Sequence, residues 1–143
     1  MRLFLDSSVV LAACGRAAGG SRRIFDLAPT QGWRLLTSGY VVREVEKNLA
    51  SRLPPTASHE WHQMAPQLDK VRDVTTFEWP VVFGPSKDRP ILFTAAAFGD
   101  VLLTLDRNDF GPLMGAGFYG LPVLTPGNFL RRERAAGRLL ASW

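Results

Sequence analysis

Acidic residues stand directly after two of the most apolar stretches of the chain. Asp6 follows Leu3-Phe4-Leu5, and Asp106 follows the apolar run 101–105, with Asp109 three residues later. Asp88 stands at the start of a predicted helix. Because ligands of open α/β sheets bind beyond the carboxyl ends of the strands, we expect these carboxylates at one edge of a sheet. Taken singly, each acid also has an ordinary explanation, as a helix cap or as part of a polar turn.

Carboxylates gathered in one place repel one another. Two unit charges about 5 Å apart cost about 3 kcal/mol at an effective dielectric constant of about 20. Such a cluster persists by raising its pKa values or by binding a cation. Oxygen ligands favour Mg²⁺ or Mn²⁺ over zinc, and Mg²⁺ keeps several waters. The pattern therefore predicts a divalent-metal site where water attacks a phosphate ester.

The elements that must position these acids alternate between strands and helices. Apolar runs predict strands at 3–5, 33–36, 101–105 and 121–124, with an extended segment at 74–83. Helices are expected over 8–18, 21–31, 38–53, 56–72 and 88–98, and again from Thr125 onward. This order predicts one α/β domain over residues 1–143, with a mainly parallel central sheet and helices on both faces.

The helix expected over 38–53 offers a further acid. With Val41 at 0° and about 100° per residue, the apolar side chains occupy an arc of about 0–120°. Glu46 falls at about 140° and Glu44 at about −60°. Both glutamates lie outside the apolar arc, Glu46 is the nearer of the two, and periodicity does not select Glu44.

The composition is that of an ordinary soluble globular protein, with 46% hydrophobic and 21% charged residues. It excludes a disordered chain, a collagen-like repeat and a coiled coil. No apolar stretch reaches the length of a membrane span, so no membrane association is expected. Asp6 interrupts any signal-peptide core, and the single cysteine, Cys14, cannot form an internal disulfide. We therefore expect a cytoplasmic protein.

The net charge of +4 is concentrated near the C-terminus. Residues 131–138 hold four arginines and Glu133, a local charge of +3, which leaves +1 for the rest of the chain. We interpret 131–143 as a basic C-terminal helix and tail that steers a nucleic-acid backbone or contacts a partner.

An ordered set of motifs resembles the PIN-domain (PilT N-terminus) family, which includes the VapC-like toxins of toxin–antitoxin pairs. The motifs are LFLDSSVV at 3–10, Thr37-Ser38 leading to VREV at 42–45, KDRPIL at 87–92, LTLDRNDF at 103–110, and LPVLTP at 121–126 with Phe129-Leu130. Together they cover almost the whole chain, and the ordered set is far more specific than any single piece.

The resemblance implies a metal-dependent endoribonuclease that is the toxin of a type II toxin–antitoxin pair. It identifies the catalytic acids as Asp6, Glu44, Asp88 and Asp106, and the ligands of Mg²⁺ or Mn²⁺ as Asp6, Asp88 and Asp106. It also places Asp109 where related proteins often carry a further acid, and it favours Glu44 over Glu46. Ser7-Ser8 replaces the threonine and asparagine of many relatives, but a hydroxyl such as that of Ser7 can still orient a metal-bound water. Because all four acids are present, we do not expect an inactive copy.

The partners implied by the resemblance are an RNA substrate, a cognate antitoxin protein and a second copy of the chain in a homodimer. Arginines expected to meet RNA phosphate are Arg89 and Arg107, beside the predicted ligands, and Arg131 and Arg132 in the basic segment.

Two other functions are compatible with the pattern. The first is a non-catalytic RNA- or protein-binding module on the same fold, with the basic tail as its working part. The second, a HAD-like phosphatase, is disfavoured because that chemistry needs a second aspartate two residues after the first, and this chain has Ser8 there.

Overall fold

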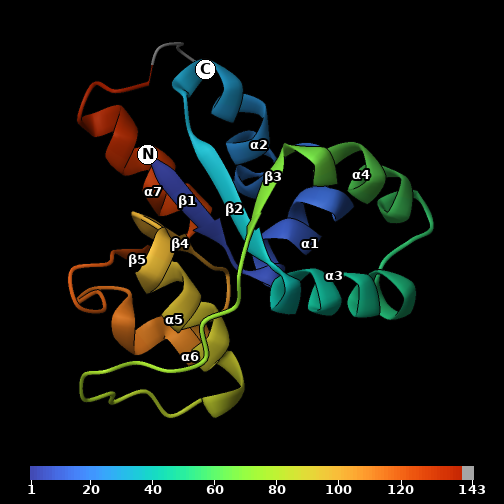
Figure 1. Ribbon diagram of the computed structural model, residues 1–143. Helices are drawn as coiled ribbons and strands as arrows, with labels where there is room; N and C mark the ends of the chain where they lie inside the picture. Colours follow the sequence, from blue (N-terminus) through green and yellow to red (C-terminus); the bar gives the residue numbers. More distant parts are fainter. Residues whose placement is uncertain (140–143) are drawn as a thin grey trace.

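A computed structural model describes residues 1–139 and shows one five-stranded sheet (Figure 1). The strands are β1 (Arg2–Leu5), β2 (Arg34–Ser38), β3 (Leu68–Val71), β4 (Val101–Leu103) and β5 (Val123–Leu124), all parallel, in the order β3-β2-β1-β4-β5. The longer helices are α1 (Ser7–Gly15), α2 (Gly20–Gln31), α3 (Gly39–Arg52), α4 (Thr56–Met64), α5 (Arg89–Phe98) and α7 (Pro126–Ala135). Single turns form α6 (Arg107–Phe110), η1 (Ala65–Gln67), η2 (Ser86–Asp88) and η3 (Gly111–Leu113).

Helices cover both faces of this sheet. The chain runs outward from β1 through β2 to β3, then returns past β1 to β4 and β5. Since crossovers between parallel strands are right-handed, this reversal places the crossover helices of the two halves on opposite faces. Helix α7 follows the last strand and packs back against α2. In Figure 1, α5 lies in front of the sheet, with α1, α2 and α7 behind it. The predicted α/β fold with a parallel sheet is confirmed.

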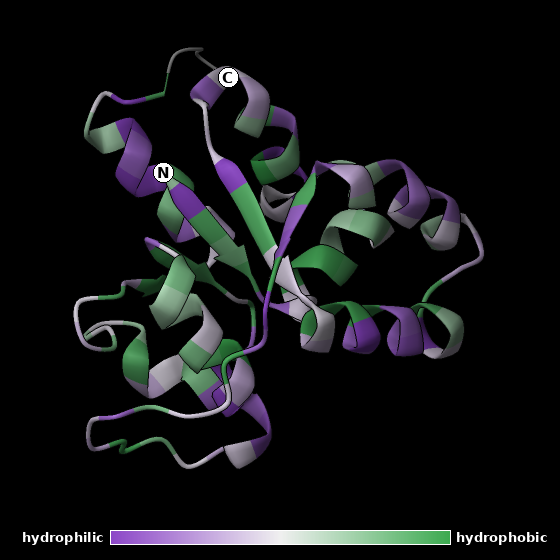
Figure 2. Cartoon of the chain, viewed as in Figure 1, coloured by the Kyte–Doolittle hydropathy of each residue, from purple (hydrophilic) through white to green (hydrophobic). Residues whose placement is uncertain are grey.

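The central strands are apolar along their length because both of their faces are covered. Leu3, Phe4 and Leu5 of β1 are fully buried, as are Leu102 and Leu103 of β4. Figure 2 shows these strands in the hydrophobic colour, while α3 alternates between hydrophobic and hydrophilic residues. Each fully buried side chain of this kind contributes about 1.5–3 kcal/mol. The strand ends are therefore held rigidly where the acids follow them.

The predicted helix over 56–72 is wrong in its second half. Helix α4 ends at Met64, and Leu68–Val71 forms the edge strand β3, which pairs with β2 through Leu35 and Leu68. Pro66 stands just before this strand and cannot donate a helical hydrogen bond. The half-exposed sequence Leu-Asp-Lys-Val lacks the alternation of a strand, so its pairing is decided by contact with β2 rather than by local pattern.

The segments 74–83 and 101–105 contain less regular strand than their apolar residues suggest. The segment 74–83 forms no regular strand; its start is fixed by the hydroxyl of Thr94, which accepts a hydrogen bond of 2.8 Å from the Val74 amide. The strand predicted over 101–105 ends at Leu103. Asp106 caps the single helical turn α6, which contains Asp109, so the alternative of a polar turn at 106–109 is compatible with the structure. No helix within residues 1–139 is long and apolar enough to cross a membrane.

Candidate functional site

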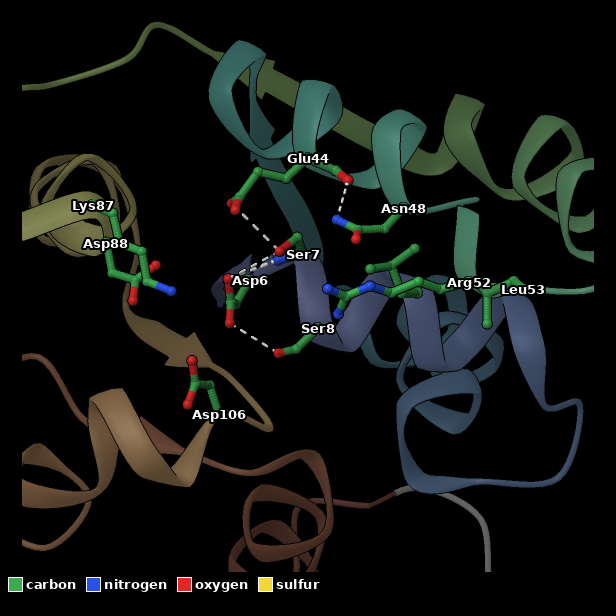
Figure 3. Close-up of a pocket in the computed structure, with 11 residues that line it drawn as sticks. Asp6, Ser7, Ser8, Glu44, Asn48, Arg52, Leu53, Lys87, Asp88 and Asp106 are labelled. Carbon is green, nitrogen blue, oxygen red and sulfur yellow. Dashed lines mark hydrogen bonds between the residues drawn. The ribbon is translucent and has the colours of Figure 1, made fainter. Parts of the chain in front are cut away.

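A cleft of about 350 Å³ opens at the carboxyl ends of β1 and β4, the edge of the sheet at which the acids were expected. Its walls include the four predicted catalytic acids, Asp6, Glu44, Asp88 and Asp106. Figure 3 shows Asp6 at the centre, with Glu44, Asp88 and Asp106 around it on three other elements. We call this the acid cleft.

Asp6 is fixed by an unusually complete set of donors. It ends β1 and caps α1, where its Oδ1 accepts a hydrogen bond of 2.8 Å from the Ser7 amide. Its Oδ2 accepts from the hydroxyls of Thr104 at 2.7 Å and Ser8 at 2.9 Å. Burial raises the pKa of Asp6, and these hydrogen bonds oppose that rise. The carboxylate is therefore held in one orientation with its oxygens toward the cleft.

Thr104 links Asp6 to the segment that carries Asp106. The Thr104 hydroxyl donates to Asp6 and accepts a hydrogen bond of 3.1 Å from the Asp106 amide. Asp106 then caps α6 by accepting a hydrogen bond of 3.0 Å from the Asp109 amide. One buried hydroxyl thus sets the spacing between the acids of two neighbouring strands.

Asp88 and Asp109 complete the tightest group of acids. One carboxylate oxygen from each of Asp88, Asp106 and Asp109 lies within 4.8 Å of the other two. Burial first, and then the neighbouring Asp109 and Asp6, raise the pKa of Asp88 to about 7. The pKa of Asp109 is lowered by its hydrogen bonding to Asp88. The closest cluster therefore contains Asp109, whereas the sequence placed Asp6 in the metal-binding set.

Glu44 reaches the acid cleft from α3, whose buried stripe is Val41, Val45 and Leu49. Its Oε1 accepts a hydrogen bond of 3.4 Å from the Ser7 hydroxyl. Burial and the charge of Asp6 raise the pKa of Glu44. Glu46 is exposed and is not part of the cleft wall. Both glutamates lie about 100° from the middle of the buried stripe, so the position of α1 beside α3 decides which one reaches the site.

The acid cleft fits a divalent cation. Its donors are carboxylate and hydroxyl oxygens, the ligands that Mg²⁺ and Mn²⁺ prefer. The Oδ2 atom of Asp88 is buried and has no hydrogen-bond partner within residues 1–139. A buried carboxylate oxygen with no donor is costly unless it is protonated or bound by a cation. Asp88, Asp106 and Asp109 are therefore the residues placed to hold such an ion, with Asp6 beside them.

Four residues in or beside the cleft have no role in the sequence prediction. Asn48, Arg52 and Lys87 line the cleft, and Thr104 lies behind Asp6. The Nζ atom of Lys87 lies 3.7 Å from Oδ2 of Asp109. The side-chain amide of Asn48 donates a hydrogen bond of 2.8 Å to the backbone carbonyl of Glu44. The sequence held a signal for Thr104, because it is the polar residue within the apolar run 101–105. In the structure its side chain is fully buried.

The predicted RNA-contacting arginines separate into different environments. Arg89 donates two hydrogen bonds, of 2.9 and 3.3 Å, to the Phe83 carbonyl, so its guanidinium holds a loop. Arg131 and Arg132 are exposed on α7 and line different cavities, and Arg107 lines the same cavity as Arg131.

The basic segment is not uniformly available to a partner. Arg138 is bonded to the buried carboxylate of Glu133, with its Nε 3.0 Å from Oε1. This arginine therefore neutralises a buried acid within the fold. Residues 140–143 of the predicted tail lie outside the described residues.

Comparison with known proteins identifies a solved structure with a similar fold. No family model and no curated protein matches the chain. Among solved structures, it is similar to a chain of VapBC2 from Rickettsia felis bound to a DNA fragment from their promoter. The match has a TM-score of 0.61 and 14% sequence identity, and covers 86% of this chain and 97% of that chain. The chain therefore has a PIN-like fold, as its motifs predicted.

Proposed function

We propose that the protein is a metal-dependent ribonuclease that hydrolyses RNA phosphodiester bonds, and that it acts as the toxin of a type II toxin–antitoxin pair in the cytoplasm. The observation that carries the nuclease proposal is the acid cleft, in which Asp88 has a buried oxygen without a protein donor. The structural likeness to a VapBC2 chain supports the toxin role and an antitoxin partner. A homodimer remains a further proposal from the motifs.

In this proposal Asp88, Asp106 and Asp6 hold one or two Mg²⁺ or Mn²⁺ ions, and Asp109 adds a fourth oxygen donor. The ion, when bound, lowers the pKa of water and neutralises charge on the phosphate. Metal binding also favours the ionised form of Asp88, whose pKa is about 7 in its absence. We therefore expect metal affinity and activity to rise with pH through neutrality.

In the same proposal, Glu44 completes the acid cleft and orients the attacking water or takes a proton from it. Burial and Asp6 raise its pKa, which makes it a better base than an exposed glutamate. The Ser7 hydroxyl holds one of its oxygens toward the cleft. In-line attack would leave a 5′-phosphate and a 3′-hydroxyl on the two products.

The test is cleavage of single-stranded RNA by wild type, Asp6→Asn and Asp88→Asn with Mn²⁺, with Mg²⁺ and with chelator. We expect cleavage only with metal, and a loss of at least about 100-fold in either variant. Glu46→Gln is the matched control, because it removes an acid from the exposed side of α3. Undiminished cleavage by Asp6→Asn would sink the assignment.

The toxin role has its own test. We expect induced expression of wild type to arrest growth, and co-expression of a small protein encoded beside it to restore growth. Asp6→Asn serves as the control that folds but does not cut RNA. Growth arrest of equal strength with Asp6→Asn would contradict toxicity through RNA cleavage.

A further inference from the structure

A second cavity, of about 330 Å³, adjoins the acid cleft and carries the opposite charge. Three arginines line it, Arg16, Arg107 and Arg131, and no acid does. The rest of its wall comes from α1, the segment before α6 and the first turns of α2 and α7. We call it the arginine cavity.

The two cavities share walls at two places. On α1, Leu11 lines the acid cleft and the next residue, Ala12, lines the arginine cavity. After β4, Asp106 lines the acid cleft, while Leu105 and Arg107 on either side of it line the arginine cavity. A polymer that lies across Asp106 therefore passes directly from one cavity to the other.

The three guanidinium groups have no acid to neutralise them. None of Arg16, Arg107 and Arg131 forms an ion pair with any acid in the part of the chain that the structure describes. Arg131 makes one hydrogen bond, to the neutral side chain of Asn128, which leaves most of its donors unused. Three unpaired positive charges around one cavity attract an anion and repel one another without it.

Ser21 points to the same kind of ligand. Only 7% of this residue is exposed, it lines the arginine cavity, and its hydroxyl has no hydrogen-bond partner within residues 1–139. It lies in the first turn of α2, whose cap, Gly19, has no side chain to bond the free amides. A Cβ at Gly20 would stand 3.5 Å from the Gly127 amide nitrogen, so α2 and α7 begin side by side. An anion here would meet a free hydroxyl and two helix N-termini as well as the arginines.

We propose that the arginine cavity binds a backbone phosphate of the RNA strand whose scissile phosphate lies in the acid cleft. This inference rests on the proposed nuclease function and adds the path of the substrate. The forked guanidinium matches phosphate geometry, and the shared wall at Asp106 favours the substrate strand over an acidic segment of a protein. The acid cleft repels RNA on its own, and the cavity supplies the attraction that brings the strand to it.

The test is binding of a fluorescent 12-nucleotide single-stranded RNA, followed by anisotropy in chelator so that no cleavage occurs. We compare wild type with Arg131→Ala and Arg72→Ala between 50 and 200 mM salt. The second variant is the matched control, since Arg72 is an exposed arginine that contacts the Phe98 ring and lines neither the acid cleft nor the arginine cavity. Thermal melting checks that both variants fold.

One phosphate contact contributes about 0.7 to the slope of log K against log salt for a single strand. We therefore expect the magnitude of this slope to be smaller by about 0.7 in Arg131→Ala than in wild type. Between 50 and 200 mM salt, the variant should then lose about 2.6-fold less RNA affinity than wild type loses. The slope should stay at the wild-type value in Arg72→Ala. Ser21→Ala should weaken binding about 2- to 5-fold with an unchanged slope, because it removes a hydrogen bond and no charge.

Equal changes in slope for the two arginine variants would overturn the cavity proposal, since the charge would then act only through the long-range field. An Arg131→Ala variant that binds RNA normally but loses an acidic protein partner would overturn it as well, as would a wild type that binds no RNA. Cleavage with Mn²⁺, measured on the same samples, separates the two proposals. If Arg131→Ala alone weakens binding but wild type cuts nothing, the nuclease proposal fails, and only the binding of an RNA phosphate in the arginine cavity stands.

Discussion

Replacing Asp88 with asparagine should stabilise the metal-free protein at neutral and alkaline pH. The pKa of this carboxyl is about 7 in the folded chain, against 3.8 as its ordinary value. The folded state therefore holds a proton that the unfolded state has lost, and the free energy of unfolding falls as pH rises from about 4 to about 7. Above that range Asp88 is ionised in both states, and the free energy of unfolding is lowered by the full cost of burying its carboxylate.

The magnitude follows from the size of the shift. Three pKa units at about 1.4 kcal/mol each give an upper limit of about 4 kcal/mol between pH 4 and pH 8. Asp109 titrates with Asp88 and its pKa moves in the opposite direction, which offsets part of this amount. We therefore expect Asp88→Asn to raise the free energy of unfolding at pH 8 by about 2 kcal/mol, and to change it little at pH 4.

The assay is urea denaturation of wild type and Asp88→Asn in chelator at both pH values. Glu46→Gln, which removes an exposed acid on α3 outside the cleft, controls for the change in net charge. The reasoning would be refuted by an Asp88→Asn variant that is less stable than wild type at pH 8, or by a difference that does not depend on pH.

Three other changes should report on the same architecture. Saturating Mn²⁺ at pH 8 should raise the melting temperature of wild type, since a ligand at 100 times its Kd adds about 2.7 kcal/mol; a calorimetric scan should show no such rise for Asp88→Asn. Thr104→Val should cost about 1–3 kcal/mol in urea denaturation and slow RNA cleavage, because it removes the donor to Asp6 and the acceptor of the Asp106 amide; a stable variant with full activity would count against this bridge. Gly117→Ala should destabilise by at least about 1 kcal/mol, since φ is +76° and a Cβ would stand 2.8 Å from the Leu121 carbonyl oxygen; Gly115→Ala, with open space around it, should melt like wild type.

The sequence predicted the buried half of the fold well. The runs before Asp6 and Asp106 form β1 and β4, because a strand covered on both faces is apolar at every position. The edge strand β3 was missed because its residues are half exposed and its pairing depends on β2, which lies about thirty residues earlier. The hydropathy pattern of residues 68–71 alone does not show that they pair with β2.

The candidate site was predictable in outline and less so in detail. The topology brings Asp6, Asp88 and Asp106 to one edge because parallel strands end together. Which acids lie closest depends on the single turn α6, which brings Asp109 close to Asp88, whereas the resemblance gave Asp109 only as a further acid near the site. Glu44 was reached through resemblance, since periodicity puts both glutamates outside the apolar arc, with Glu46 the nearer of the two. The pairing of Arg138 with a buried glutamate was invisible in a run of basic residues.

The most direct test of the central proposal follows metal binding and RNA cleavage together. Mn²⁺ is titrated into chelator-treated wild type and Asp88→Asn at pH 7.5, with bound metal measured by calorimetry and cleavage of labelled single-stranded RNA measured at each concentration. We predict that cleavage by wild type rises in step with bound metal and leaves 5′-phosphate ends, while Asp88→Asn shows neither. RNA cut at the same rate in chelator, or metal bound equally by both proteins without cleavage by either, would contradict the account.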